Sequence, residues 1–408
     1  MNAKDGLIIK KQLFIENLRR RMNELNKKLS ILLLIYNVDE YLDKYVDNLI
    51  KTCGDKEYEI ILLDKGSTDK SSEFCLTWQR KNNNCVYVQT YSDDDKDCIR
   101  FGAHIADGEY FCYITSDEIK NNIIPENLFE KLTSAVSSLL YSNKTYNRPF
   151  ITIVITSYNK EMFVQRAIQS VKNMNYSEWE CIIVDNSSTD NTLQIVLENI
   201  KNDNRFKLIS QTNKNVCHAR NIGAFGGIGK YLTFLDADDE IGKDYCSKAI
   251  EEMEKNKKIC ISTGCFTRFY LDGSTDNFKT YAYLMNTMHY KHRIKTELAC
   301  NQFTVTSIFK MDRFKKIKGF RIGTEYTQED WEMIIRYFYY NLNEIDVYFI
   351  DDFVLNMYSV EDSKTKTQNK NWGNNQACLL EMYNENPNIY EKFFSVEEIE
   401  KIKNLIVL

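Results

Sequence analysis

The chain has 408 residues, of which 43% are hydrophobic and 27% charged, as is typical of a globular protein with two or three domains. Its 53 basic and 58 acidic side chains give a net charge of -5, which argues against a nucleic-acid partner. Every apolar run is shorter than the roughly 18 residues of a membrane span, and we expect no signal peptide. The 12 cysteines are scattered without a C-x-x-C pair, which indicates reduced thiols in a cytoplasmic protein rather than a zinc site.

The two ends of the chain have helical patterns. Residues 7 to 28 are predicted to form a charged amphipathic helix that leads into a buried strand at Ile31 to Tyr36. From about residue 365 onward the pattern is again mostly helical, with a break near Asn386-Pro387. We expect these terminal segments either to act as docking or homo-oligomer helices or to pack against their own domains.

A sequence repeat divides the chain into two related units. The segment LSILLLIYNVDEYLDKYVDNLI corresponds to ITIVITSYNKEMFVQRAIQSV, with Asn37 aligned to Asn159 at an offset of 122. The segment YEIILLDKGSTDKSSE corresponds to WECIIVDNSSTDNTLQ, and GEYFCYITSDEI to GKYLTFLDADDEI, both at an offset of 121. Three blocks that recur at nearly one spacing indicate an internal duplication.

Each unit is predicted to alternate strands and helices. In the second unit we expect a strand at 151 to 156, a helix from Lys160, a strand at 180 to 185, a helix near 191 to 201, and strands at 207 to 210 and 231 to 236. The continuous β-branched first strand is typical of a parallel sheet buried on both faces. The fold class is therefore an open α/β sheet, whose ligands bind at the carboxyl ends of the strands. Thr156 to Asn159, Asp185 and Asp236 fall at those ends.

The most acidic stretch follows the strand YLTFLD. It places four carboxylates in five positions, namely Asp236, Asp238, Asp239 and Glu240. These groups repel one another unless solvent or a cation compensates their charge. Oxygen ligands suit Mg²⁺ or Mn²⁺, which also bridge the phosphates of nucleotides. Taken alone, the same residues are equally consistent with an acidic turn that caps the next helix.

Four successive segments resemble the family 2 glycosyltransferases of the GT-A fold: VITSYNKEMFVQRAIQSV, IIVDNSSTDNT, NVCHARNIGAFGGIGKYLTFLDADDE and QEDWEMIIRY. They span about residues 150 to 360 in the family's order and approximate spacing. The first unit resembles only the nucleotide-binding half of the same fold. The resemblance implies tandem GT-A-like, Rossmann-like sheets that are open and mostly parallel, with a truncated N-terminal copy and a helical C-terminal extension.

The resemblance also implies roles for the matching residues. The nucleotide would be held by Thr156, Tyr158, Asn159, Asp185, Asn186, Arg220 and Asp236, with Asp185 near the base. Asp238 would be the main ligand of a Mn²⁺ or Mg²⁺ cofactor, with Asp236 as the second metal ligand. Arg220 belongs to the A-R-N motif, and the alternative interpretation is a surface cation on a helix.

The segment TEYTQEDWEMIIRYFYY carries a second acidic motif. Apolar residues recur there at helical spacing, at Trp331, Ile334, Ile335 and Phe338. This spacing places Glu329 and Asp330 in the first turn of a helix. In the family such a pair supplies the catalytic base, so we expect Asp330 to deprotonate the acceptor hydroxyl and Glu329 to be its neighbour or an acceptor ligand. Thr327 and Asp330 also resemble a capping box, and both roles are compatible.

Two features depart from the family pattern. The segment from Asn356 to Thr365 lacks the late histidine that often approaches the metal or diphosphate, and His289 and His292 lie well upstream. In the first unit, our alignment pairs Ser116 with Asp238 and Asp117 with Asp239. No acidic residue there matches Asp236, the Arg-Asn pair is lost, and the unit is too short for an E-D helix.

These features predict four parts, at residues 1–29 (N-terminal helix), 30–148 (degenerate GT-A-like domain), 149–362 (catalytic GT-A domain) and 363–408 (helical C-terminal extension). We expect an inverting hexosyl- or hexosaminyltransferase that uses a nucleotide-sugar, with uridine as the family's usual base. The acceptor would be a glycan, lipid-linked or protein-linked hydroxyl in bacterial surface polysaccharide or glycoconjugate synthesis. The enzyme would be cytoplasmic, and a lipid-linked acceptor would bring it to the inner face of the membrane.

Two alternatives come from other functional classes. A non-catalytic nucleotide-sugar-binding or scaffold subunit would account for the degenerate first unit and the missing histidine. A nucleotidyltransferase shares the α/β sheet and the acidic metal site. It normally needs a Gly-rich, basic loop after the first strand, and the segment TSYNKEMF does not provide one.

Overall fold

The computed structural model describes most of the two units and a part of the C-terminal extension. The described residues are 29–54, 57–92, 94–108, 110–124, 150–212, 215–270, 273–277, 303–322, 329–339, 346–358, 383–384 and 387–403. The predicted N-terminal helix lies outside them. The described part of the extension contains two helices, α17 (Pro387–Phe393) and α18 (Val396–Lys403). No helix in the described ranges combines the length and the apolar character that a membrane crossing requires.

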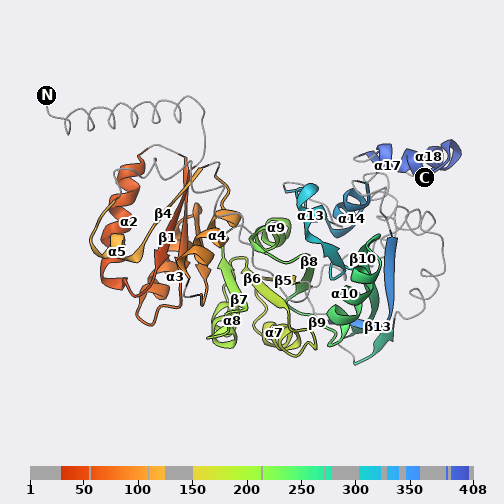
Figure 1. The fold of residues 1–408 in the computed structure, drawn as a ribbon, viewed down its shortest axis with the longest axis horizontal. Coiled ribbons are helices and arrows are strands. Elements are labelled where there is room, and N and C mark those ends of the chain that lie inside the picture. Colours follow the sequence, from red (N-terminus) through yellow and green to blue (C-terminus); the bar gives the residue numbers. More distant parts are fainter. Residues whose placement is uncertain are drawn as a thin grey trace.

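Both units alternate strands and helices, as the sequence predicts (Figure 1). The first unit consists of β1 (Leu29–Ile35), α2 (Asp39–Cys53), β2 (Tyr58–Asp64), α3 (Ser71–Lys81), β3 (Cys85–Gln89), α4 (Asp95–Ile105), β4 (Tyr110–Ile114) and α5 (Ser116–Lys120). The second unit begins with β5 (Ile151–Ser157), α7 (Val164–Lys172), β6 (Trp179–Asp185), α8 (Thr192–Ile200), β7 (Phe206–Ser210), α9 (Val216–Gly226) and β8 (Tyr231–Asp236).

The second unit continues beyond the repeat. Its further elements are β9 (Glu240–Ile241), α10 (Tyr245–Lys255), β10 (Ile259–Phe269), β11 (Thr275–Asn277), β12 (Ile308–Lys310), α13 (Met311–Lys316), α14 (Glu329–Tyr339) and β13 (Asp346–Tyr358). Strand β12 pairs antiparallel with β8, and β10 joins β12 to β13, so this extension widens the same sheet. The first unit has no such extension among its described residues, which makes it the shorter copy.

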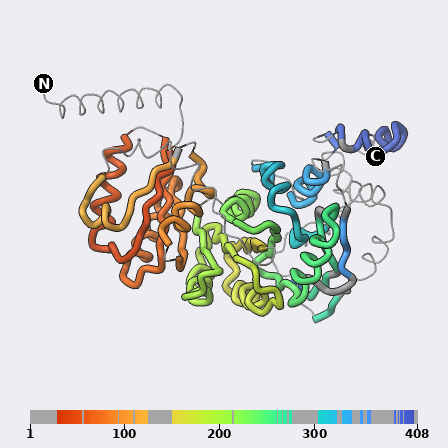
Figure 2. Tube along the Cα trace, viewed as in Figure 1, coloured from red at the N-terminus to blue at the C-terminus, as the bar shows by residue number. Residues whose placement is uncertain are grey.

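One sheet runs through both units. Its strand order is β4-β1-β2-β3-β7-β6-β5-β8-β12-β10-β13-β9, with β11 paired to β10. Within each unit the repeat strands are parallel, whereas β3 pairs antiparallel with β7 and so joins the units. At this join Val88 lies opposite Ile209. Figure 2 follows the chain from the first unit, in red and orange, into the second, in yellow to blue.

The core follows from strands that are apolar on both faces. Side chains on one face of the sheet form a single cluster that extends from Leu32 and Val88 in the first unit to Val154 and Ile209 in the second. Helices α4 and α9 cover this face and meet at the join, where Gly226 lies against Phe101. The opposite face divides into two clusters, one for each unit. The shared cluster makes the two units one packed body.

The duplication extends to individual hydrogen bonds. Asn37 and Asn159 both have left-handed backbones, with φ of 52° and 51°. The side-chain oxygen of each accepts a 2.8 Å hydrogen bond from the backbone N–H of a threonine, Thr68 in the first unit and Thr189 in the second. These bonds hold the loop after the first strand against the loop after the second. The repeat found in the sequence is therefore a repeat of three-dimensional structure.

A buried glutamate occupies the same place in both units. Glu180 accepts hydrogen bonds from Thr152 Oγ1 at 2.8 Å and from the Ile228 backbone N–H at 2.7 Å, and pairs with Lys207 at 2.7 Å. Burial alone raises its pKa, but these partners lower the pKa below the ordinary value, so the side chain is ionised. Its counterpart Glu59 accepts hydrogen bonds in the same way from Ser30 and from two backbone N–H groups.

The strand register corrects one part of the sequence alignment. Ile114 lies opposite Leu33 in the first unit, as Leu235 lies opposite Ile155 in the second. Continuing this register places Thr115 at the position of Asp236, which agrees with the lack of an acidic match there. Asp117 then corresponds to Asp238 and Ser116 to Ala237, one position away from our pairing. Thr115 forms a capping box with Glu118 at the start of α5, so a helix start replaces the acidic turn.

Two equivalent glycines allow α4 and α9 to lie close to the sheet, and they give a stability test. A Cβ at Gly223 would lie 2.5 Å from Val154 Cγ1, and one at Gly102 would lie 2.7 Å from Leu32 Cδ2. We expect Gly223→Ala to lower the free energy of unfolding by about 1–3 kcal/mol, because a β-branched valine cannot rotate away. Gly102→Ala should cost less, because the end of a leucine side chain can move. Urea denaturation of both variants measures the difference.

Lys44→Ala is the control, because it introduces the same helix-forming residue, alanine, at an exposed position of α2. If Gly223→Ala were as stable as the parent protein, the close approach of α9 to β5 would be refuted.

Candidate active site

The carboxyl ends of β5, β6 and β8 bring the predicted donor-side residues together. Because β5 lies between the other two strands, Ser157 is opposite Asp185, and Thr156 is opposite Asp236. Thr156 Oγ1 lies 3.5 Å from Asp236 Oδ1, at the outer limit of a hydrogen bond. The sheet therefore places these residues at one edge, where open α/β sheets bind ligands.

Two buried polar atoms at this edge have no hydrogen-bond partner among the described residues. They are Asp185 Oδ1 and Ser157 Oγ, and both side chains are only 2% exposed. Burial raises the pKa of Asp185, although hydrogen bonds from Ser188 act in the opposite direction. Leaving buried polar groups unpaired costs free energy, and such groups mark sites where a ligand completes the bonding.

The equivalent place in the first unit is filled by the protein itself. Asp64, the counterpart of Asp185, accepts hydrogen bonds from Tyr87 at 3.0 Å and from the Ser72 hydroxyl. Its second oxygen accepts two backbone N–H bonds. The second unit has Leu208 and Leu193 where the first has Tyr87 and Ser72, so Asp185 lacks these hydroxyl partners.

Three other predicted residues lie in the same loops, with different exposure. Tyr158 is 43% exposed, so its ring is open to a ligand. Asn186 is buried, and its side-chain oxygen accepts a 3.0 Å hydrogen bond from Gln211. Asn159 uses its side-chain oxygen to hold Thr189, as Asn37 does for Thr68. Asn159 thus holds the loop after β5 against the loop after β6, and we call it a loop clamp.

The acidic turn after β8 is neutralised by the protein's own groups. Asp238 pairs with Lys160 at 2.7 Å, and Glu240 pairs with Arg166 at 2.9 Å. Asp239 is 7% exposed and accepts a 3.0 Å hydrogen bond from the backbone N–H of Tyr358. Burial and the charges of the neighbouring aspartates raise the pKa of Asp239 well above its usual range. These contacts offset the electrostatic repulsion that the sequence predicts among the carboxylates of this turn.

Tyr358 lies in the segment in which the family's late histidine was expected. Its hydroxyl donates a 2.9 Å hydrogen bond to Glu240, and its ring lies 3.4 Å below the Arg166 guanidinium. Arg166 also donates to the backbone oxygen of Asp238 at 2.9 Å. The end of β13 therefore supports the acidic turn with an aromatic and a hydroxyl group. Residues 359–365 of the expected histidine segment lie outside the described ranges.

Arg220 connects the donor-side loops to α14. Its side chain is 5% exposed and pairs with Asp236 at 3.1 Å and with Glu329 at 3.0 Å. Burial alone would lower the pKa of this guanidinium, but Asp236, Glu329 and Asp330 together raise it above the usual value. Arg220 is thus a buried, permanently charged link, which rules out the alternative of a surface cation.

The predicted carboxylate pair begins α14, as the sequence indicates. Glu329 is held by Arg220, while Asp330 is only half-buried and contributes to the field at Arg220. Asp330 also accepts a 2.8 Å hydrogen bond from the Trp331 backbone N–H, a contact within the first helical turn. The Thr327 of the expected capping box lies outside the described residues.

Two further contacts fix α14 relative to α9. Asn221 exchanges a pair of hydrogen bonds with the backbone of Phe320, at 2.7 and 2.8 Å. Arg336 pairs with Glu332 at 2.6 Å and donates to the backbone oxygens of Ile317 and Gly319. The loop before α14 is thereby attached to the helix that carries Arg220.

The comparison with protein families agrees with this arrangement. The sequence model described as glycosyl transferase family 2 matches residues 30–137 and 152–320, more than half of the chain. The chain belongs to this family. One matched segment falls in each structural unit, and the second ends before α14 and β13.

Several curated proteins are similar to this chain in sequence. An uncharacterized glycosyltransferase of Haemophilus influenzae is 32% identical over 179 residues, which cover 42% of this chain and 68% of the relative. The putative teichuronic acid biosynthesis glycosyltransferase TuaG of Bacillus subtilis is 25% identical over 229 residues, covering 55% and 86%. The hyaluronan synthase of Pasteurella multocida is 30% identical over 152 residues, covering 36% of this chain and 16% of that protein.

Two solved structures are among those that match part of this chain. S. aureus TarS 1-349 in complex with UDP-GlcNAc is 17% identical, with 57% of this chain and 66% of that chain covered and a TM-score of 0.46. The mannosyltransferase PcManGT from Pyrobaculum calidifontis, in complex with GDP-Man and Mn²⁺, is 15% identical, with 59% and 64% covered and a TM-score of 0.45.

The oxygen ligands of the acidic turn are compatible with a divalent cation only in part. Among the described residues, no three His, Cys, Asp or Glu side chains are grouped as metal ligands. Asp238 and Asp236 supply two carboxylates, each paired with a basic side chain. Mg²⁺ is typically held by one or two carboxylates together with substrate phosphates, so this pair suffices when a nucleotide supplies the remaining oxygens.

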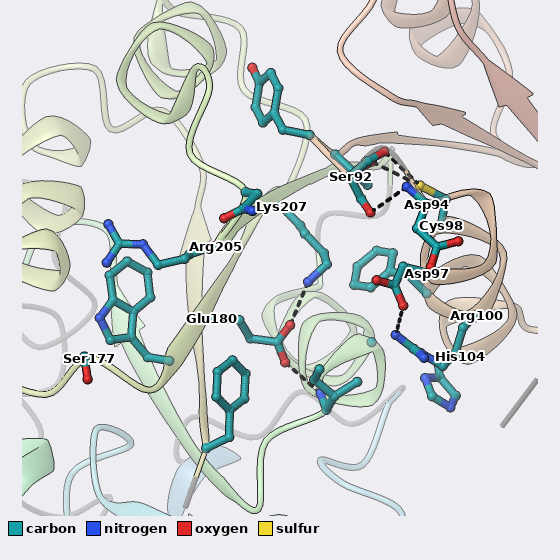
Figure 3. Close-up of a pocket in the computed structure, with 18 residues that line it drawn as sticks. Ser92, Asp94, Asp97, Cys98, Arg100, His104, Ser177, Glu180, Arg205 and Lys207 are labelled. Carbon is teal, nitrogen blue, oxygen red and sulfur yellow. Dashed lines mark hydrogen bonds and ion pairs between the residues drawn. The ribbon is translucent and has the colours of Figure 1, made fainter. Parts of the chain in front are cut away.

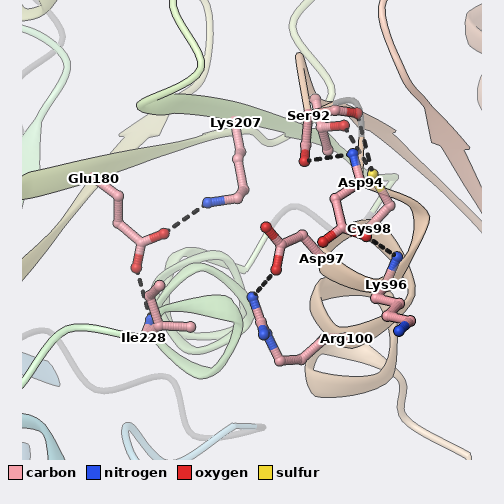
Figure 4. Close-up of polar contacts among 10 residues, drawn as sticks. Ser92, Asp94, Lys96, Asp97, Cys98, Arg100, Glu180, Lys207 and Ile228 are labelled. Carbon is pink, nitrogen blue, oxygen red and sulfur yellow. Dashed lines mark hydrogen bonds and ion pairs between the residues drawn. The ribbon is translucent and has the colours of Figure 1, made fainter. Parts of the chain in front are cut away.

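A separate cavity of about 460 Å³ lies at the junction of the two units of this glycosyltransferase, away from the predicted residues. Figure 3 shows that α4 and the first residues of β6 and β7 line it. Four of its charged groups form two ion pairs, Glu180 with Lys207 and Asp97 with Arg100, as Figure 4 shows. Burial lowers the pKa of His104 on its wall to about 4, so this imidazole is neutral at pH 7. The cavity is therefore a gap in the packing between the two units.

The site contains residues that the sequence did not reveal. Ser157 lies beside Asp185, but a serine inside an apolar strand carries no signal of its own. Lys160 and Arg166 provide charges to the acidic turn from 78 and 72 positions away in the sequence. Only the pairing of β5 with β8 brings them close, so no local pattern could have identified them.

The opposite environments of Asp185 and Asp64 give a paired stability prediction. We expect Asp185→Asn to raise the free energy of unfolding at pH 7 by about 0.5–2 kcal/mol, because it removes a buried charge at a binding site. Asp64→Asn should instead lower it by about 1–3 kcal/mol, because it disturbs four hydrogen bonds. Urea denaturation of each variant between pH 3.5 and 7.5 measures both effects.

The pH dependence follows from the raised pKa of Asp185. A carboxyl whose pKa is raised by folding stabilises the protein below its unfolded pKa, near 3.8, and this contribution is lost as the pH rises through the folded value. The increase in the free energy of unfolding caused by Asp185→Asn should therefore become larger from acid to neutral pH. Equal destabilisation by both substitutions would contradict the difference between the two units.

Proposed function

We propose that the second unit is the catalytic domain of an inverting, metal-dependent glycosyltransferase. The observation that carries this proposal is the buried Arg220, which joins Asp236 on the donor side to Glu329 at the start of α14. A sugar transfer requires a nucleotide site and a base within reach of one anomeric carbon. Arg220 is the contact that brings the two halves of such a site together.

The donor is proposed to be a nucleotide-sugar, with uridine as its base. The free oxygen of Asp185 suits the imide N–H of uracil, and Ser157 Oγ is a second partner at the same edge. Tyr158 offers an exposed ring on which a base can stack. Thr156 and Asp236 lie next to this pocket, where the ribose and diphosphate would follow. The donor sugar is a hexose or hexosamine in this proposal.

The cofactor is proposed to be Mn²⁺ or Mg²⁺, held by Asp238 with the help of Asp236. Such a cation offsets the charge that develops on the diphosphate leaving group. Arg220 pairs with Asp236 and so orients its carboxylate. Glu240 pairs with Arg166, and the buried Asp239 accepts the Tyr358 backbone N–H, so we assign the other two carboxylates, Asp238 and Asp236, to the cation.

Asp330 is proposed to take the proton of the acceptor hydroxyl. Glu329 pairs with the buried Arg220, whereas Asp330, half-buried in the same first turn of α14, is the member of the pair that we assign as the base. The hydroxyl oxygen then attacks the anomeric carbon as the bond to the diphosphate breaks, and the configuration at that carbon inverts. Arg220 balances the negative charge of the carboxylates while the proton is held on Asp330.

The first unit is proposed to be a degenerate copy that serves as a scaffold. Its base pocket is filled by the Tyr87 and Ser72 hydroxyls, and Ile35 replaces Ser157. Thr115, at the position of Asp236, begins a helix. Each change removes a group that a donor nucleotide would need.

The acceptor is proposed to be a hydroxyl of a glycan, lipid-linked or protein-linked chain in bacterial surface polysaccharide or glycoconjugate synthesis. The relatives named for teichuronic acid biosynthesis and hyaluronan synthesis support a polysaccharide context. The proposed location is the cytoplasm, with peripheral attachment at the inner face of the membrane when the acceptor is lipid-linked.

A second candidate function is a non-catalytic nucleotide-sugar-binding or scaffold subunit of a glycan-assembly complex. It is favoured by the observation that Lys160, Arg166 and Arg220 already neutralise the acidic turn without a metal. A scaffold would have no need of the catalytic base that we propose at Asp330, in the first turn of α14.

Two substitutions separate binding from chemistry. Asp238→Ala and Asp330→Asn should each reduce sugar transfer by at least about 100-fold. Only Asp238→Ala should weaken Mn²⁺-dependent binding of UDP, because Asp330 acts on the acceptor. Calorimetric titration with UDP and with GDP, in Mn²⁺ and then in EDTA, measures binding, and release of the nucleoside diphosphate measures transfer.

Asp117→Ala, at the Asp238 position of the first unit, is the matched control and should leave both measurements unchanged. Loss of activity in Asp117→Ala would overturn the assignment of the two units. If neither nucleotide bound to the folded protein, the scaffold function would replace the enzymatic one.

A further inference from the structure

Lys160 is the basic residue closest to the proposed metal ligand. It follows the loop clamp residue Asn159, and its backbone N–H donates a 2.7 Å hydrogen bond to Thr192 Oγ1, which fixes the start of the side chain. Its ammonium then reaches Asp238 Oδ2 at 2.7 Å. The two side chains are 24% and 17% exposed, so the pair is open to solvent and to a ligand.

Lys160 differs in its contacts from the two arginines of the site. Arg220 is almost fully buried and holds two carboxylates, while Arg166 holds Glu240, the backbone of Asp238 and the ring of Tyr358. Among the described residues, the Lys160 ammonium has the single partner Asp238. A flexible lysine with one partner can exchange it, whereas the arginines are held from several sides.

The lysine is present only in the unit that keeps the donor pocket. Val38 occupies the same position in the first unit, and its backbone N–H donates to Ser71 Oγ just as that of Lys160 donates to Thr192. The backbone geometry is therefore retained, while the charged side chain is not. This difference links the ammonium to the function of the second unit rather than to the folding of the loop.

An ammonium and a divalent cation compete for the same carboxylate oxygen. With Lys160 in place, a metal approaching Asp238 meets a positive charge and must replace an existing ion pair. A nucleoside diphosphate changes this balance, because its phosphate oxygens offer the ammonium a new anionic partner beside the metal. The lysine can then leave Asp238 without losing its counter-ion.

We propose that Lys160 is a resident counter-ion of Asp238 that yields this carboxylate to a divalent cation and moves to the diphosphate when the donor binds. Metal binding thereby depends on the nucleotide through a residue of this chain. This inference rests on the proposed donor site and adds a positioning residue that controls the order of loading. By linkage, the metal and the nucleotide strengthen each other's binding by the same factor.

The test is the affinity of the full chain for Mn²⁺ alone, measured by the electron paramagnetic resonance signal of the free ion. We expect Lys160→Met to bind Mn²⁺ at least about fivefold more tightly than the parent protein in the absence of nucleotide. Lys160→Arg should remain within about twofold of the parent. Lys258→Met, which removes an exposed lysine far along the chain, controls for the overall change of charge.

The same titrations are repeated with saturating UDP. The parent protein should gain at least about tenfold in Mn²⁺ affinity, and Lys160→Met should gain several-fold less, because its metal site is already free. If Lys160→Met bound Mn²⁺ no more tightly than the parent without UDP, the inference would be wrong. Circular dichroism melting of each variant verifies that a changed affinity does not come from unfolding.

The results distinguish a failure of the role of Lys160 from a failure of the proposed function. Asp238→Asn should abolish Mn²⁺ binding in both the parent and the Lys160→Met background. If the parent bound UDP with Mn²⁺ but Lys160→Met showed no gain for the metal, the donor site would stand and the role of Lys160 would fall. If UDP and GDP both failed to bind the parent protein, the proposed function itself would fail.

Discussion

The antiparallel pairing of β3 with β7 is the contact on which the arrangement of this glycosyltransferase depends. Within each unit the strands are parallel, so the loops that can bind a ligand leave from one edge of the sheet. Because the two joining strands run in opposite directions, the carboxyl edge of one unit lies beside the amino edge of the other. The loop after β3 therefore lines the junction cavity together with Glu180 and Lys207. It does not reach the proposed donor site, where the first unit acts instead through the end of α3: the charge of Arg80 acts to lower the pKa of Asp185.

The two units show how one backbone can carry two different chemistries. The clamps at Asn37 and Asn159 and the buried glutamates are the same in both, and they hold the loops after the first two strands. Changes occur at side chains that face those loops. A tyrosine and a serine complete the hydrogen bonds of Asp64, whereas leucines leave Asp185 with a free oxygen. The first unit thus gains internal bonding, and the second keeps an unsatisfied group for a ligand.

Much of this could be predicted from the sequence, because the signals are local or repeated. The strand and helix alternation, the duplication, the carboxyl-end positions of Asp185 and Asp236, and the helical start at Glu329 all follow from residue periodicity. The pairing of Asp117 was displaced by one residue, because the sequence alignment matched the DEI letters while the strand register follows the hydrogen bonds. The partners of the acidic turn could not be predicted, because they come from a different strand–helix connection.

Some basic side chains that pair with the acidic turn are fixed, and one is exchangeable. This difference suits the proposed binding of an anionic donor. Four carboxylates alone would repel a diphosphate, so the free protein needs positive charge in place before the substrate arrives. Arg220 supplies it permanently, because it is buried and is bonded both to the donor side and to α14. Lys160 supplies it from a solvent-accessible position with a single partner. In the proposed reaction, the fixed guanidinium would preserve the distance between donor and base, while the exchangeable ammonium would follow the phosphate charge.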